Sequence, residues 1–156
     1  MTECIVGIIS DTHGLIRPAA LDELRGADLI VHAGDIGSQS VMHALLSIAP
    51  VTAVRGNSDR GYWTEGLHGA ETFEVCGMFF HVLHDLSALD LDPHAAGVRV
   101  VISGHSHRPM ISEKDGILYL NPGSAGPRRF TLPVTLARIR IRDCRLLPDI
   151  IRLEQG

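Results

Sequence analysis

The amino-acid sequence predicts an α/β protein in which two β-sheets pack together as a sandwich, with helices on the outside. The first third of the chain alternates short apolar runs with amphipathic stretches, which is typical of strand–helix–strand units with parallel strands. The rest of the chain is richer in strands, and turn residues separate its paired apolar segments. No repeat, low-complexity segment or linker interrupts the 156 residues, so we expect one domain over residues 1–156.

The elements of the first third follow from the residue pattern. Residues 4–10 form a nearly continuous apolar run that ends at Asp11, which indicates a buried strand. Pro18 suits the first turn of a helix, and Ser38 suits a helix cap. The expected order is strand 4–10, a helix from Pro18 through AALDEL, strand Leu29–Ala33, helix Gln39–Ile48 and strand Val51–Val54.

Later segments predict hairpins and one further buried strand. The dipeptide Asp115-Gly116 between two apolar runs is a strong hairpin signal, and Cys76-Gly77 occupies a similar position. The expected strands are Glu71–Val75 paired with Met78–Leu83, then Val98–Ser103, Met110–Lys114 paired with Ile117–Leu120, and Thr135–Ile141 paired with Arg145–Ile151.

Composition narrows the classes of function. The formal net charge of −4 argues against bulk nucleic-acid binding, because contact with the phosphate backbone needs a basic face. No apolar run approaches the roughly 20 residues that span a bilayer. Residues 1–10 lack the basic start and cleavage site of a signal peptide, so we expect a cytoplasmic protein without membrane contact. The sequence leaves the oligomeric state open, including a homo-oligomer.

The three cysteines are Cys4, Cys76 and Cys144. They are odd in number, widely spaced and set in apolar segments. This pattern predicts reduced, buried thiols, and the absence of close pairs argues against a cysteine-ligated zinc site.

Polar side chains that can bind metal follow five of the expected strands. In open α/β sheets, ligands bind beyond the carboxyl ends of the strands, so a common edge would bring these groups together. The candidate metal ligands, in chain order, are Asp11, His13, Asp35, Asn57, His84, His105 and His107.

These seven candidates combine two carboxylates, one amide oxygen and four imidazoles. That mixture suits Mn²⁺, Fe²⁺, Co²⁺, Ni²⁺ or Zn²⁺ better than Ca²⁺, which prefers oxygen ligands. Seven ligands are too many for one ion with an open position and suit two ions. Gly34, Gly56 and Gly104 each directly precede a candidate ligand, where glycine permits a close approach of the backbone.

The motifs resemble those of the calcineurin-like metallophosphoesterases, in particular their small prokaryotic phosphodiesterase branch. The resemblance rests on Asp11-Thr12-His13, Gly34-Asp35, Gly56-Asn57-Ser58-Asp59, His84, Gly104-His105-Ser106-His107 and the loop Asn121-Pro122-Gly123-Ser124. It implies the metallophosphoesterase fold, a two-sheet α/β sandwich, and a metal-dependent phosphoric ester hydrolase acting on a small-molecule phosphoester. Manganese is the first choice of metal.

The resemblance also implies a role for each ligand. Asp11, His13 and His107 would hold a first metal, whereas Asn57, His84 and His105 would hold a second. Asp35 would bridge the two, and Asp35, Asn57 and His105 are expected to serve catalysis as well. Two ions about 3.5–4 Å apart can share a hydroxide that acts as the nucleophile.

Two positions depart from the family pattern. Ser58 stands where many members carry a histidine that donates a proton, so we expect faster hydrolysis of aryl than of alkyl diesters. Asp85 replaces the usual glycine after His84 and would change the charge of the rim. A non-catalytic scaffold of the same fold, as in the retromer subunit, and a phosphomonoesterase or nucleotidase are the alternatives.

Several other residues near these motifs have open roles. Asp59 either orients a ligand histidine or caps a turn. His32 lies within an expected strand, which favours a hydrogen-bonded core histidine over a ligand.

Overall fold

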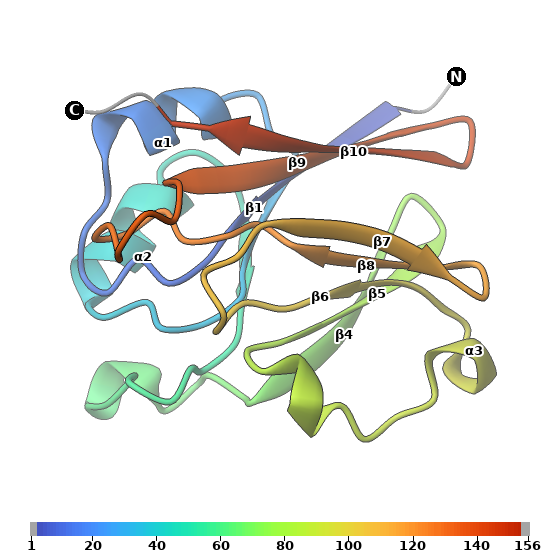
Figure 1. Cartoon of the computed structure of the whole chain (residues 1–156), viewed down its shortest axis with the longest axis horizontal. Coiled ribbons are helices and arrows are strands. Elements are labelled where there is room, and N and C mark those ends of the chain that lie inside the picture. The colour runs from blue at the N-terminus through green and yellow to red at the C-terminus, as the bar shows by residue number, and fades with distance from the viewer. Residues whose placement is uncertain (1–2, 154–156) are drawn as a thin grey trace.

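The computed structural model describes residues 3–153 and contains two five-stranded sheets packed face to face, with helices outside them (Figure 1). The predicted two-sheet α/β architecture is therefore confirmed. The two ends of the domain expected over residues 1–156 lie outside the described residues. Within residues 3–153, no helix is long and apolar enough to cross a membrane.

The first sheet has the strand order β10-β9-β1-β2-β3. Its parallel part consists of β1 (Glu3–Ile9), β2 (Leu29–His32) and β3 (Val51–Ala53), which are connected by helices α1 (Pro18–Leu24) and α2 (Gln39–Leu46). On the other side of β1 lie the antiparallel strands β9 (Thr135–Arg142) and β10 (Arg145–Arg152). The expected strand–helix–strand units with parallel pairing are thus present.

The second sheet has the order β4-β5-β6-β8-β7. Strands β5 (Met78–Leu83), β6 (Val98–Ile102) and β8 (Ile117–Asn121) are parallel, and β4 (Ala70–Val75) and β7 (Met110–Lys114) pair antiparallel at the two edges. Three short helical segments lie in the loops, namely η1 (Tyr62–Thr64), η2 (Leu86–Ala88) and α3 (Pro93–Ala96). They are too short to produce a periodic apolar pattern, and the sequence did not predict them.

Two apolar layers hold the molecule together. The layer between the sheets contains the inward side chains of β1 together with those of β5, β6 and β8, with Phe80 fully buried. The second layer lies between the first sheet and its helices, where Ile9 and Ile30 pack with Leu24 and Leu45. Because β1 is covered on both faces, its sequence reads as a continuous apolar run.

The carboxyl ends of parallel strands from both sheets meet at one rim. In the first sheet, β1 and β2 run into loops that are tied together where the Asp11 N–H donates to the Gly34 carbonyl. In the second sheet, β5 and β6 end side by side, and the Gly104 N–H donates to the His84 carbonyl. The rim therefore collects the loops that carry the candidate ligands.

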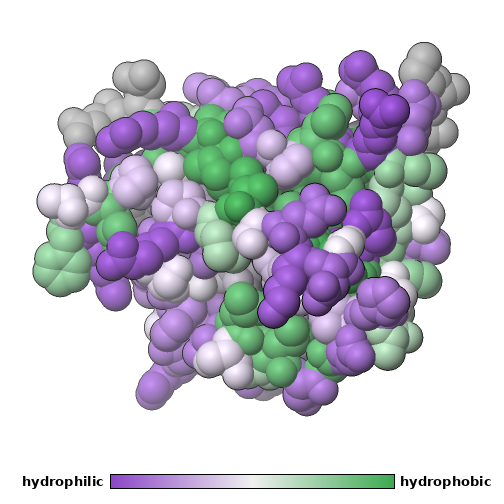
Figure 2. Space-filling view, turned by 45° about the vertical axis from the view of Figure 1, so that its right-hand side comes forward, coloured by the Kyte–Doolittle hydropathy of each residue, from purple (hydrophilic) through white to green (hydrophobic). Residues whose placement is uncertain are grey.

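The surface is mixed in polarity. Figure 2 shows apolar areas on one face of the molecule, separated by hydrophilic side chains. Large apolar side chains that are exposed in residues 3–153 include Phe79, Ile111 and Leu147. A homo-oligomer stays a prediction.

The predicted strands and main helices agree with the structure to within a few residues. The Asp115-Gly116 turn has the left-handed backbone at both residues that a tight hairpin requires. One detail differs: Ser38 occupies the N-cap of α2, but its hydroxyl bonds to the Ser40 hydroxyl and not to the helix backbone.

The prediction of reduced, buried cysteines was wrong. Cys4 and Cys76 form a disulfide, and Cys144 is free and exposed in the turn between β9 and β10. Cys4 shares the inner face of β1 with Val6 and Ile8, and Cys76 lies in the turn between β4 and β5. The packing of the two sheets brings these cysteines together across 72 residues of sequence, a distance at which the sequence alone shows no pairing signal.

Replacing Cys4 and Cys76 together by serine should lower the free energy of unfolding of the oxidised protein by roughly 2–4 kcal/mol, because the bridge closes a long loop and restricts the unfolded chain. Urea denaturation of the wild type with and without reductant measures the effect, and Cys144→Ser serves as the matched control. If the wild type and the double variant share one midpoint under both conditions, the disulfide does not stabilise the fold.

Candidate metal centre

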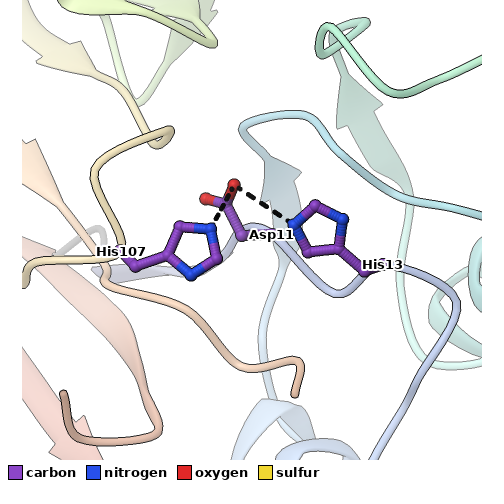
Figure 3. Close-up of side chains that lie close together, drawn as sticks. All are labelled: Asp11, His13 and His107. Carbon is purple, nitrogen blue, oxygen red and sulfur yellow. Dashed lines mark ion pairs between the residues drawn. The ribbon is translucent and has the colours of Figure 1, made fainter. Parts of the chain in front are cut away.

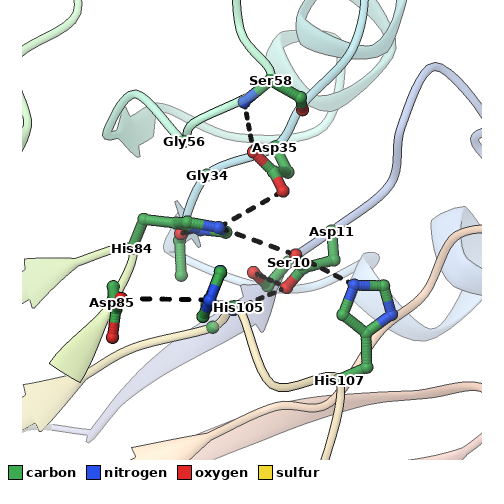
Figure 4. Close-up of polar contacts among 12 residues, drawn as sticks. Ser10, Asp11, Gly34, Asp35, Gly56, Ser58, His84, Asp85, His105 and His107 are labelled. Carbon is green, nitrogen blue, oxygen red and sulfur yellow. Dashed lines mark hydrogen bonds and ion pairs between the residues drawn. The ribbon is translucent and has the colours of Figure 1, made fainter. Parts of the chain in front are cut away.

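The loops after the parallel strands bring the candidate ligands to the rim where the two sheets meet (Figure 4). Asp11 and His13 follow β1, and Asp35 follows β2. From the second sheet, His84 follows β5, and both His105 and His107 follow β6. Four of these side chains, on Asp11, Asp35, His84 and His107, are buried.

The Asp11 carboxylate lies at the centre of this group. Its Oδ2 atom accepts hydrogen bonds from the Ser10 hydroxyl at 2.6 Å and from the His105 backbone N–H at 3.1 Å. Its Oδ1 atom is buried and has no hydrogen-bond donor within residues 3–153. That oxygen faces three imidazole Nε2 atoms, at 3.9 Å for His13, 3.9 Å for His84 and 3.3 Å for His107.

Asp35 occupies the space between two groups of ligands. Its Oδ1 accepts the Ser58 backbone N–H at 3.0 Å, while Oδ2 lies 3.7 Å from His13 Nε2 and 3.3 Å from His84 Nε2. Burial alone would raise the pKa of Asp35, but the interactions with His84 and Ser58 outweigh it and hold that pKa far below its usual range. The carboxylate is therefore ionised at neutral pH.

The His84 ring is oriented by a backbone carbonyl. Its Nδ1 atom donates to Ala33 O at 2.8 Å, which leaves Nε2 with a lone pair that points into the site. Burial disfavours the charged ring, yet the Asp35 carboxylate, the Ala33 carbonyl and the charge of Asp11 together raise the pKa of His84. A proton and a metal ion would therefore compete for the same Nε2 atom.

The hydrogen-bonding state of the donor atoms indicates whether a metal ion fits the site. Buried side-chain atoms without a hydrogen-bond partner in residues 3–153 include Asp11 Oδ1, His13 Nε2 and His84 Nε2, all at this rim. Two sets have their donor atoms within 4.8 Å of one another: Asp11 with His13 and His107 (Figure 3), and Asp11 with Asp35 and His84. Buried polar atoms are normally paired, so these orphaned atoms fit a bound cation.

The remaining expected ligands lie on the open side of the site. Asn57 and His105 line one cleft together with His84, and the His84 and His105 rings meet edge to face at 5.2 Å. The His105 Nε2 atom lies 3.9 Å from Asp85 Oδ2. The structure thus brings these residues to the same rim, but Asn57 and His105 are exposed, unlike the ligands around Asp11.

Unusual backbone geometry marks the site. Five candidate ligands have a left-handed backbone with φ between 48° and 71°, namely Asp11, His13, Asp35, His105 and His107. Most other non-glycine residues of this kind within residues 3–153 lie in hairpin turns. Such strained conformations cost energy and cluster at functional sites. The sequence contains no signal for them, because aspartate and histidine occur in every backbone region.

All three glycines that precede ligands are required by close packing, and a Cβ atom at Gly34, where φ is +102°, would lie 2.7 Å from His84 Nδ1. A Cβ atom at Gly56 would lie 2.1 Å from Asp35 Oδ1, and one at Gly104 would lie 2.1 Å from Ser10 Oγ. These contacts explain why glycine precedes Asn57 and His105.

The Asn121–Ser124 loop supports the site from behind. Asn121 Nδ2 donates to Gly104 O at 2.9 Å and to Ser106 Oγ at 3.1 Å. The Ser124 hydroxyl donates to the Asp11 carbonyl at 3.1 Å. This loop therefore fixes the backbone of Asp11 and of the loop that carries His105 and His107.

The two open roles are resolved. The Asp59 carboxylate accepts the N–H groups of Gly37 and Gly56, so it caps a turn and joins two loops, and it does not contact a ligand histidine. His32 is fully buried; its Nδ1 accepts the Gly34 N–H, and its Nε2 bonds to the Thr12 hydroxyl. Burial lowers the pKa of His32 to about 3, so it is a neutral core histidine.

Comparisons with known proteins agree with this geometry. Residues 5–143 match the family model of the calcineurin-like phosphoesterase superfamily domain. A probable metallophosphoesterase of Methanothermobacter thermautotrophicus is 36% identical over 160 residues, covering 95% of this chain and 92% of that protein. A phosphodiesterase of Methanocaldococcus jannaschii is 25% identical over 136 residues, and the match covers 76% of this chain and 82% of that protein.

A solved structure shares the fold at lower identity. Vacuolar protein sorting 29 from Cryptosporidium parvum superposes with a TM-score of 0.76 at 18% identity, covering 99% of this chain and 100% of that chain. This likeness concerns the arrangement of strands and helices.

Substituting Gly104→Ala should weaken Mn²⁺ binding about 10- to 100-fold, because the new methyl group would displace Ser10 from Asp11 and misplace its free oxygen. Isothermal calorimetry on the metal-free protein measures the affinity. Gly66→Ala is the matched control, since a Cβ at Gly66 meets nothing within 4 Å. Equal affinities for the two variants would show that the Ser10–Asp11 contact does not set metal binding.

Proposed function

This chain belongs to the calcineurin-like phosphoesterase superfamily, and from that premise we propose that it is a phosphodiesterase that works with two divalent metal ions. The observation that carries the proposal is the free Asp11 Oδ1 atom, which faces three imidazole nitrogens in a buried setting. Such an atom is unstable without a cation.

The proposed ligand sets follow the two sides of the rim. Asp11, His13 and His107 would hold the first ion, and Asn57, His84 and His105 would hold the second. Asp35 would serve both sets, a role supported by the short distances from its Oδ2 to both His13 and His84. The donor mixture suits Mn²⁺ first, with Fe²⁺, Co²⁺, Ni²⁺ and Zn²⁺ as alternatives.

When bound, the two ions supply Lewis acidity, a lowered pKa of water and positive charge for the phosphoryl oxygens. The protein itself keeps Asp35 ionised and holds His84 in the tautomer that presents Nε2. Overall, an oxygen of water forms a new bond to phosphorus, the bond to one alcohol oxygen breaks, and that oxygen takes up a proton. Ser58 donates its backbone N–H to Asp35, and its hydroxyl is too weak an acid to protonate a poor leaving oxygen efficiently.

Two considerations favour a diester over the alternatives. A relative named as a phosphodiesterase is 25% identical over 136 residues and covers 76% of this chain. A scaffold of this fold would not need all seven donors, and here each donor lies at the rim.

The cytoplasmic location stays a prediction. The Cys4–Cys76 disulfide argues against it, because disulfides persist mainly in oxidising compartments.

Asp35→Asn should reduce the turnover of bis(p-nitrophenyl) phosphate by on the order of 10³-fold, because an amide cannot bridge two cations as a carboxylate does. Metal content by mass spectrometry and a thermal melt accompany the assay. Asp92→Asn removes the same charge at the N-cap of α3, away from the rim, and should retain activity. Full activity of Asp35→Asn would exclude the bridging role.

Ser58→His should narrow the gap between aryl and alkyl leaving groups by about 10²-fold, because an imidazolium can protonate a poor leaving oxygen. Rates for ethyl p-nitrophenyl phosphate and diethyl phosphate, followed by phosphorus NMR, give the gap. Ser58→Ala is the control and should keep the wild-type ratio. Similar wild-type rates on both esters would contradict a limiting role for Ser58.

A further inference from the structure

A cleft of about 520 Å³ opens beside the metal centre on the side of the second sheet. Its lining includes Asn57, His84 and His105, three of the proposed ligands. Its other walls combine small or apolar residues with charged ones, namely Arg55, Gly69, Ala70, Leu83, Asp85, Ala88 and Asp90. A diester bound at the metals would therefore place one of its two alcohol groups in this cleft.

The charged side chains of the cleft are mostly acidic. Asp85 is held in place by the N–H of Ser87 at 3.0 Å and its hydroxyl at 2.8 Å. Asp90 is the second carboxylate. The cleft's one arginine, Arg55, is oriented by a hydrogen bond from its guanidinium to Thr64 O at 2.9 Å.

The proposed metal centre and the cleft share His84. Its side chain is 6% exposed, and its Nε2 atom, a proposed metal donor, has no hydrogen-bond partner within residues 3–153. His84 also lines the cleft, and its ring packs edge to face on the more exposed His105 (Figure 4). A phosphate bound at the proposed metals would therefore lie beside the cleft that Asp85 and Asp90 line.

We propose that this cleft selects phosphodiesters in which one alcohol carries an organic cation, with Asp85 and Asp90 contacting the cation. The inference rests on the proposed phosphodiesterase function and specifies its substrate class. The apolar floor formed by Leu83, Ala70 and Ala88 suits the carbon substituents of an ammonium group. The same carboxylates oppose a second negative charge, which disfavours anionic alcohols.

A pair of isosteric substrates tests this selection. p-Nitrophenyl phosphocholine and p-nitrophenyl 3,3-dimethylbutyl phosphate differ only in a quaternary nitrogen against a carbon, and both release p-nitrophenol. For the Mn²⁺-loaded wild type, kcat/KM should favour the cationic ester about tenfold, as expected for a charge near two partly exposed carboxylates. The preference should shrink at high ionic strength because salt screens exposed charges.

Variants connect the preference to the two residues. Asp85→Asn and Asp90→Asn should each lower the ratio of the two kcat/KM values, and the double variant should bring it close to one. Glu113→Gln removes the same charge on β7, outside the cleft, and should leave the ratio unchanged. A wild-type ratio near one, or a ratio that survives the double variant, would overturn the inference.

Calorimetry separates this inference from the proposed function. Phosphocholine and 3,3-dimethylbutyl phosphate are titrated into the Mn²⁺-loaded protein, and phosphocholine should bind about tenfold more tightly, with the difference lost in the double variant. Equal affinities, or no binding of phosphocholine, would overturn the inference. If no phosphodiester is hydrolysed while this binding preference holds, the phosphodiesterase function fails and the cation-selective cleft stands.

Discussion

Asp11 makes hydrogen bonds to loops of both sheets at the rim where the sheets meet. Its backbone N–H reaches the loop after β2 through Gly34, and its carbonyl accepts from Ser124 in the loop after β8. Its Oδ2 atom accepts from His105 in the loop after β6. With its other bonds used in this way, the free Oδ1 is held in one direction, toward the imidazoles. The position of the metal centre therefore depends on how Asp11 connects both sheets.

This arrangement carries a conformational cost that the rest of the rim offsets. Asp11, Asp35 and three of the histidines have left-handed backbones. Hydrogen bonds fix the backbone of these loops. Examples are the bond from the His13 N–H to the Asp35 carbonyl and the bonds of the turn that Asp59 caps. Strain of this kind persists only where the surroundings leave no alternative.

Most of the strands and the positions of the candidate ligands could be predicted from the sequence, because the strands are buried. Strands such as β1 and β6 are buried on both faces, so their apolar runs stop abruptly at Asp11 and at Gly104-His105. The end of a run locates a ligand without any knowledge of the sheet. In contrast, the Cys4–Cys76 disulfide and the contact between Gly104 and Ser10 depend on which loops the packed sheets bring together. The sequence did not predict that Asp85 caps η2, because a three-residue helix leaves no periodic pattern.

The two sides of the candidate metal centre differ in burial, which suggests that they have different roles. Around Asp11 the donor atoms of the carboxylate, His13 and His84 are buried and lack hydrogen-bond partners within residues 3–153, which suits a bound cation. Around His105 the donors are exposed and face a cleft with acidic walls. Two divalent ions would outweigh the charges of Asp11 and Asp35, so the field at the phosphate is positive although the chain carries −4 overall. In the proposed function, the metals would attract the phosphate, and Asp85 and Asp90 would influence the choice among phosphate esters through the group that extends into the cleft.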